Sequence, residues 1–326
     1  YVPSPTWISI GIYYAVLIVA FSGLLKTPPR KMIFAATLIF IGAIYFVRWE
    51  NSRAETQITI LPLNGGHAIF VDAAGRKNDW LMDCGDENAV NFTLKNFLRA
   101  QGVNKISNLV LTEGESRNCG GAILLDEFFG VGELWTSPAH FRSGNYNRIV
   151  SEFEKSSPDK LNWWGERPRE PRRKIFNFDT QIGNWKTLWP PATNHFPRAD
   201  DNALVLLGNF RGTQILLLSD LSRAGQSELL SQTNDLRADV VVAGLPNEGE
   251  PLCDALIDAI QPKMIVIADS AFPANRRANR ELKKRLAQPK IPIIYKRDDG
   301  AVKIVVNKTG WKLQTMDGRK FIFRQN

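Results

Sequence analysis

Two long uncharged runs near the start of the chain limit what this sequence can fold into. Residues 7–25 are long enough to cross the hydrocarbon core of a bilayer; residues 32–47 form a shorter run, which the interfacial Trp49 extends. The alternative is a cleaved signal peptide followed by a buried helix, but a signal peptide rarely has a second apolar run so close behind it. We therefore predict two transmembrane helices within residues 1–50.

The charges around these runs predict their orientation. The connector, residues 26–31 (KTPPRK), holds three cations and no anion, whereas arginines and glutamates balance after the second run. The positive-inside rule places such a connector in the cytoplasm. Residues after Glu50 are then expected to face outward, on the periplasmic side of the cytoplasmic (inner) membrane. Because the chain starts at Tyr1 rather than Met, we also expect it to be a piece of a longer protein.

The remaining residues have the composition of a globular domain. The 326-residue chain is 44% hydrophobic and 23% charged, and its net charge of +8 favours an anionic partner such as nucleic acid or lipid headgroups. Its three cysteines show no CxxC spacing, which argues against a disulfide-built scaffold.

Strand-like and helix-like patterns follow one another from residue 57 onward. Two strands flank a turn at residues 64–66, and helices are expected at residues 87–101, Ala122–Phe129 and 253–260. A basic helix is expected at residues 276–285, and the final segment resembles a β-meander. The polar stretch at residues 156–184 is expected to be a surface excursion. Two halves of this kind predict two packed sheets with helices outside, an α+β fold.

The order of short motifs resembles the metallo-β-lactamase-like domain that ends ComEC-type competence proteins, which are DNA-uptake membrane proteins. The resemblance covers most of residues 57–316. The motifs are LNGGHA at 63–68, DCG at 83–85, TEGESRNCGG at 112–121, LWPP at 188–191, NALVL at 202–206, SD at 219–220, ADV at 238–240 and AGLP at 243–246. The resemblance implies an αββα sandwich over residues 57–326.

The resemblance also implies a zinc site that generates hydroxide to attack a phosphodiester, yet the ligands of that site are missing here. Glu113 and Asn118 stand in place of the two loop histidines, Glu115 and Arg117 in place of two aspartates, and Leu245 or Pro246 in place of a later histidine. Asp220 matches the bridging aspartate. The three histidines, His67, His140 and His195, lack ligand spacing. We predict a degenerate domain with no metal and no other cofactor, and a vestigial site comprising Asp83, Glu113, Glu115, Arg117, Asn118 and Asp220.

Two interpretations of this vestigial site remain. Glu113, Glu115 and Asp220 could hold Mg²⁺ or Mn²⁺ through oxygen, or Arg117 could pair with Glu115 or Asp220 and close the cavity; the second is favoured because a guanidinium repels a dication. Asp83 is expected to accept backbone N–H groups and fix the neighbouring loops. Cys84 and Cys119 are expected to converge, either as a disulfide or as two small buried residues.

Basic residues beside aromatic ones suggest contact with single-stranded DNA. The candidates are Trp163, Trp164, Arg167, Arg169, Arg172, Arg173, Arg276 and Arg280. Charge runs are more often solvated faces, and the tryptophan pair suits a core equally well. The predicted function is the terminal portion of a DNA-internalisation protein of natural competence, a pseudoenzyme domain that guides, binds or gates DNA. Its predicted partners are DNA, membrane lipid and the rest of a multi-span channel. The alternatives are a metal-dependent phosphodiesterase or nuclease degrading the non-transported strand, and a purely structural docking domain.

Overall fold

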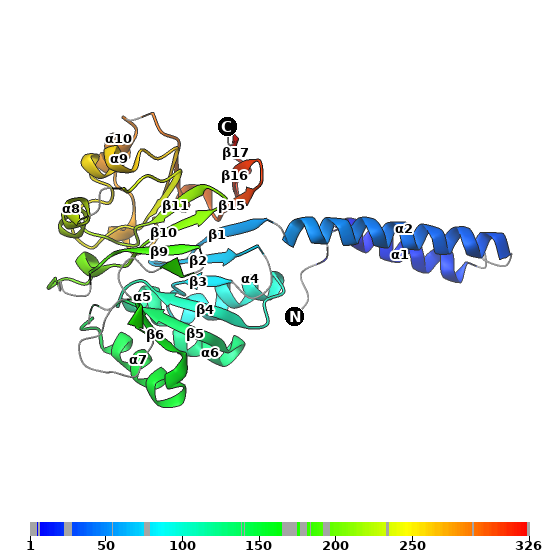
Figure 1. Cartoon of the computed structure of the whole chain (residues 1–326), viewed down its shortest axis with the longest axis horizontal. Coiled ribbons are helices and arrows are strands. Elements are labelled where there is room, and N and C mark those ends of the chain that lie inside the picture. Colours follow the sequence, from blue (N-terminus) through cyan, green and yellow to red (C-terminus); the bar gives the residue numbers. More distant parts are fainter. Residues whose placement is uncertain are drawn as a thin grey trace.

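The structure is a computed structural model, and it describes residues 5, 7–22, 28–53, 55–74, 79–137, 139, 141–164, 175–176, 181–182, 184–191, 196–232, 235–288 and 290–324. Two helices, α1 (Trp7–Phe21) and α2 (Pro28–Arg53), lie side by side and extend away from the remaining elements (Figure 1). A hydrogen bond between the Ser9 hydroxyl of α1 and the Tyr45 hydroxyl of α2, 3.1 Å apart, connects the two helices. We call this pair the helical hairpin.

Trp7–Phe21 of the first apolar run and the whole of the second are thus helical, but their span across a membrane stays a prediction. Within the described residues, no helix combines the length and the apolar character that a membrane crossing requires.

The first sheet has ten strands, and its last three come from the end of the chain. Its order is β17-β16-β15-β1-β2-β3-β4-β5-β6-β7. Strands β3 to β7 run parallel, and the others pair antiparallel. The strands are β1 (Thr56–Pro62), β2 (His67–Asp72), β3 (Trp80–Met82), β4 (Ile106–Leu111), β5 (Val131–Thr136), β6 (Leu161–Trp164), β7 (Ile175–Phe176), β15 (Val302–Asn307), β16 (Gly310–Thr315) and β17 (Lys320–Arg324).

The second sheet has seven strands in the order β14-β13-β12-β11-β10-β9-β8. It is antiparallel from β8 to β11 and parallel from β11 to β14. The strands are β8 (Gln181–Ile182), β9 (Trp185–Trp189), β10 (Val205–Phe210), β11 (Thr213–Leu217), β12 (Val240–Ala243), β13 (Met264–Ile267) and β14 (Ile293–Tyr295).

Helices follow the sequence pattern closely. A continuous helical stretch formed by α3 (Glu87–Ala89), a π-helical turn (Val90–Leu94) and α4 (Lys95–Ala100) ends before Gly102, whose φ of +78° suits glycine. The others are α5 (Ser116–Cys119), α6 (Ala122–Phe129), α7 (Gly144–Ser156), α8 (Arg223–Gln232), α9 (Asp254–Ile260), α10 (Arg280–Leu286) and α11 (Lys296–Asp299), with 3₁₀ turns at Pro158–Lys160, Asp200–Asn202 and Ala274–Arg276.

Three separate apolar cores define four layers. One core lies between the first sheet and the helices α4, α6 and α7. A second lies between the two sheets, where side chains such as Ile58 and Val242 meet. The third lies between the second sheet and α8, α9 and α10. This order of helix, sheet, sheet and helix confirms the predicted αββα arrangement, which we call the sandwich, and Figure 1 shows its two sheets with helices outside them.

Two sequence expectations are wrong in detail. Residues 156–184 were expected to be a surface excursion, but Leu161–Trp164 forms β6 beside β5, and Leu161 and Trp163 are buried because alternate residues of this strand face the first core. The expected basic helix begins at Arg280 rather than Arg276. Cys84 and Cys119 are free and buried, so they are two small core residues and not a disulfide.

Candidate functional site

Asp83 fixes the loop that follows β4. Its Oδ1 accepts the Thr112 backbone N–H at 2.9 Å, and its Oδ2 accepts the Thr112 hydroxyl at 2.5 Å. His67 Nε2 lies 3.2 Å from the same Oδ2. Asp83 has a φ of +55°, a left-handed conformation that these contacts hold in place. The predicted bracing role of Asp83 is confirmed, and His67 is a partner that the sequence analysis missed.

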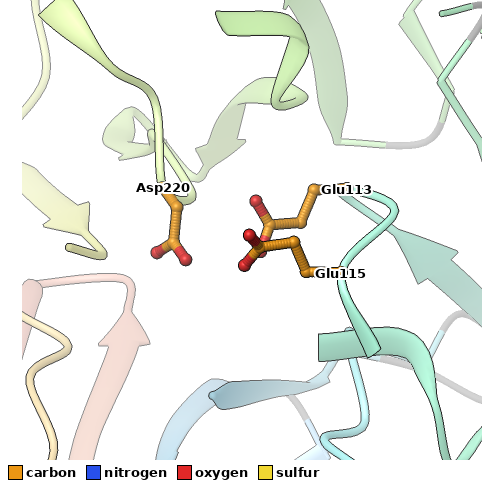
Figure 2. A group of neighbouring side chains, drawn as sticks. All are labelled: Glu113, Glu115 and Asp220. Carbon is orange, nitrogen blue, oxygen red and sulfur yellow. The ribbon is translucent and has the colours of Figure 1, made fainter. Parts of the chain in front are cut away.

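Three carboxylates converge beside this brace. Glu113 and Glu115 come from the loop between β4 and α5, and Asp220 comes from the loop after β11. One oxygen of each lies within 4.8 Å of the others. Figure 2 shows the Glu113 and Glu115 side chains approaching Asp220 from the opposite side of the site. The site is therefore shared between the loops of the two sheets.

Arg276 supplies a cation to these carboxylates. Its NH1 lies 3.0 Å from Asp220 Oδ2, and its NH2 lies 3.2 Å from Glu115 Oε2. NH2 also donates to Asn247 Oδ1 at 2.6 Å. Arg276 was predicted as a nucleic-acid contact, but only 2% of its surface is exposed, because the short 3₁₀ turn after β13 directs it inward. That assignment is corrected: Arg276 belongs to the vestigial site.

Arg117 pairs with Glu115 and not with Asp220. The guanidinium contacts the Glu115 carboxylate, and its NH2 also donates to Asn247 Oδ1 at 3.2 Å. The predicted pairing of Arg117 with Glu115 is thus confirmed, whereas closure of the site against a metal stays a prediction. Asp220, the other partner considered for Arg117, is paired with Arg276 instead.

Glu113 and Asn118 form the innermost part of the site. The Asn118 amide donates to Glu113 Oε1 and lies 3.5 Å from Asp220 Oδ2. Glu113 Oε2 and Asn118 Oδ1 are buried atoms without a hydrogen-bond partner among the described residues. Burial, and then repulsion by Asp220, raises the pKa of the Glu113 carboxyl well above its usual value.

Burial also shifts the pKa of two further groups here. It raises the pKa of Asp220 to about 6, opposed by the charges of His67 and Arg117. It lowers the pKa of Lys296 to about 8, opposed by Asp269 and Asp220, and the Lys296 ammonium donates to the Gly66 carbonyl at 2.9 Å. Charges of both signs therefore fill a small buried volume.

Asn247 connects the charges at the outer rim. Its side-chain nitrogen donates to Glu115, and its backbone N–H donates to Asp200 Oδ2 at 2.5 Å. Neither Asn247, Asp200 nor Lys296 was predicted. No sequence motif marks them, because each comes from a distant segment and gains its role only when the loops of both sheets meet.

The donor set does not fit zinc. Typical zinc sites in proteins contain imidazole or thiolate ligands, with carboxylates as additional ligands, whereas all the converging donors here are carboxylate oxygens. His67, the histidine beside them, contacts Asp83. Two guanidinium groups already bind Glu115 and Asp220, so a dication would enter against two fixed positive charges. The residues present accordingly support no zinc-hydroxide step.

The remaining candidates for nucleic-acid contact fall into three groups: residues outside the described part, a buried residue and an exposed residue. Arg167, Arg169, Arg172 and Arg173 lie outside the described residues, as does the side chain of Trp164. Trp163 is only 2% exposed and packs in the first core, so it cannot stack on a base from outside. Arg280, at the start of α10, is exposed.

Neither a protein-family model nor a curated protein matches the sequence. Solved structures do resemble it. A metallo hydrolase from the hyperthermophilic archaeon Ignicoccus hospitalis is 12% identical, with 76% of this chain and 98% of that chain covered and a TM-score of 0.45. A diphosphatase of the PhnP family is 12% identical, with 83% and 98% covered and a TM-score of 0.40. The metallo-β-lactamase MIM-2 is 16% identical, with 71% and 89% covered and a TM-score of 0.38. The described part of the chain itself shows the four-layer αββα sandwich, with two sheets and three apolar cores.

Proposed function

We propose that this chain is the terminal part of a ComEC-type DNA-internalisation protein, in which the helical hairpin lies in the cytoplasmic membrane and the sandwich guides or gates a DNA strand without cleaving it. In this proposal the sandwich faces outward, and its partners are single-stranded DNA, lipid and the rest of a channel.

The observation that supports the non-catalytic part of the proposal is that arginines pair with two of the three carboxylates, Glu115 and Asp220. Glu115 contacts Arg117 and Arg276, and Asp220 contacts Arg276. A guanidinium keeps its proton at any pH a cell reaches, so these pairs do not release their carboxylates to a metal or a water by titration. The third carboxylate, Glu113, is buried and hydrogen-bonded to Asn118.

The membrane part rests on the surface of the helical hairpin. Large apolar side chains are exposed along both helices, among them Ile18, Phe21, Ile33, Ile39, Phe40 and Phe46. Contiguous apolar surface of this kind marks a membrane or protein contact rather than a surface facing water. The cationic connector, residues 26–31, supports the orientation, because positively charged loops stay in the cytoplasm.

The DNA part rests on charge and is tested by salt dependence. The net charge of +8 favours a polyanion, and residues 167–174 carry four arginines and one lysine. Fluorescence anisotropy of a labelled oligothymidylate with the full chain in detergent gives the affinity at several salt concentrations. The double variant Arg172→Ala/Arg173→Ala should weaken binding several-fold and reduce the slope of log affinity against log salt by about 1.4, since each single-strand phosphate contact contributes about 0.7.

The matched control removes two exposed cations elsewhere. Lys308 and Lys312 lie at the β15–β16 hairpin, and Lys308→Ala/Lys312→Ala should leave both affinity and slope unchanged. Equal losses in the two double variants would contradict a defined contact at residues 172 and 173. Absence of any binding by the unaltered chain would favour the structural docking domain instead.

A metal-dependent phosphodiesterase is the second candidate, and the convergence of Glu113, Glu115 and Asp220 favours it. Oxygen donors of this kind suit Mg²⁺ or Mn²⁺ rather than zinc. Hydrolysis of a model phosphodiester in the presence of Mn²⁺, lost in Glu115→Gln, would establish this candidate and refute the non-catalytic proposal.

A further inference from the structure

Arg276 is a fixed cation at the point where the two halves of the sandwich meet. The residue lies between β13 and α10 in the second half, and only 3% of its side chain is exposed. One terminal nitrogen contacts Asp220 of its own half, and the other contacts Glu115 of the first half. The same group therefore joins loops from both sheets.

The two contacts use two of the three carboxylates that converge here. Arg276 NH1 is 3.0 Å from Asp220 Oδ2, and NH2 is 3.2 Å from Glu115 Oε2. A divalent cation bound to those oxygens at about 2.0–2.6 Å would lie within a few ångströms of the guanidinium carbon, in a buried site that screens poorly. Arg276 and a dication cannot occupy this place together.

We propose that Arg276 is the built-in cation of this site: it takes the electrostatic place of a metal ion, joins the two sheets and excludes divalent cations. Removal of its side chain uncovers a latent oxygen-donor site for a hard divalent cation such as Mn²⁺. This inference concerns what holds the site together, and it goes beyond the proposed role in DNA transport.

Without Arg276, the remaining oxygen atoms would form a suitable ligand set, although Glu115 would still be shared with Arg117. Glu113, Glu115 and Asp220 each offer one oxygen within 4.8 Å of the others. Glu113 Oε2 and Asn118 Oδ1 are buried without a hydrogen-bond partner among the described residues, so they are free to accept a cation. Such a set contains oxygen only, which selects Mn²⁺ or Mg²⁺ over Zn²⁺.

The test compares Arg276→Ala with Arg280→Ala in the full chain in detergent. Arg280 is an exposed arginine four positions away on the same segment, so its loss controls for charge. Titration calorimetry with Mn²⁺ should show one ion bound per chain of Arg276→Ala, and none bound by Arg280→Ala or the unaltered chain. At a hundredfold excess over the dissociation constant, Mn²⁺ should raise the unfolding midpoint of Arg276→Ala by roughly 5–10 °C.

A second substitution shows whether the ion binds at this place. Adding Asp220→Asn to Arg276→Ala should weaken Mn²⁺ binding at least tenfold, because it removes one charged ligand. If Arg276→Ala does not fold alone, Arg276→Gln and refolding in Mn²⁺ provide the same comparison. Stoichiometric binding of Mn²⁺ or Zn²⁺ by the unaltered chain would overturn the proposal, and so would Arg276 variants that fold without binding Mn²⁺ or that stay unfolded in its presence.

Discussion

The helical hairpin and the vestigial site both depart from the usual rule that apolar side chains are buried and charged ones exposed. In the hairpin, large apolar groups such as Ile39 and Phe40 are exposed. In the vestigial site, charged groups such as Arg276, Asp220 and Lys296 are buried. Each departure costs free energy unless a partner compensates it.

The two regions differ in where that partner comes from. The vestigial site contains its own, because Arg276 lies between Asp220 and Glu115. The exposed apolar side chains of the helical hairpin have no such partner among the described residues, and the proposed function supplies one in lipid or in another part of a channel. A buried charge cluster can thus be complete within one chain, whereas exposed apolar helices point to an assembly.

The largest effect is expected from removing the internal partner. Arg276→Met should lower the free energy of unfolding by about 3–5 kcal/mol, because Asp220 is left as an unpaired buried charge. The double variant Arg276→Met/Asp220→Leu should recover at least half of that loss. Denaturant unfolding of the full chain in detergent, followed through the buried Trp185 and Trp189, measures both. A double variant less stable than Arg276→Met would show that the pair is not the compensating element.

A smaller effect is expected from disturbing the external partner. Ile39 is 73% exposed on α2, and Ile39→Asp should oppose membrane insertion by about 3 kcal/mol. Carbonate extraction of membranes should then release part of the protein while the sandwich stays folded. Met316→Asp, at an exposed position in the sandwich, is the control and should change nothing. Full retention of Ile39→Asp in membranes would argue that α2 contacts protein rather than lipid.

The buried lysine gives a pH dependence of known sign. Lys296 has its pKa lowered from 10.5 to about 8 in the folded state, so the unfolded chain binds more protons between those values. Stability should therefore rise with pH in this range, by about 2 kcal/mol between pH 7 and pH 9.5. Lys296→Met should abolish the rise. If the free energy of unfolding rose equally with pH in both proteins, groups other than Lys296 would be the cause.

The smallest effect is expected from an ion pair at the surface. Arg198 and Glu248 form a contact of 2.5 Å with side chains 59% and 64% exposed. Arg198→Ala should cost under about 1 kcal/mol, because water and salt screen an exposed pair. The same denaturant unfolding measurement compares this loss of free energy with the loss in Arg276→Met. A loss comparable to that of Arg276→Met would remove the distinction between buried and exposed pairs.

The sequence predicted the elements and their order because local patterns carry that information. Helices at Ala122–Phe129 and near residues 253–260, the β1–β2 hairpin and the final meander all follow from periodicity and turn residues. The pairing of Arg117 with Glu115 was also within reach, since the two residues lie in one loop.

The rest of the site depended on contacts between distant segments. Arg276 was predicted to contact nucleic acid because it begins a cation-rich run, residues 276–285, and nothing in its local pattern marks a turn inward. For Trp163 the sequence left a DNA contact and a core position open, because the polar stretch around it gave no sign of the four-residue strand β6. Such placements depend on which loops meet in three dimensions.

The pairing of β1 with β15 has a consequence for how the sandwich forms. β1 follows α2 almost directly, and its Ile58 pairs with Ile304 near the end of the chain. During synthesis β1 therefore emerges early with one edge open, and the first sheet closes only when β15 to β17 arrive. A ribosome that stalls before β15 would leave an unpaired apolar edge beside the helical hairpin, ready to associate with a neighbouring chain.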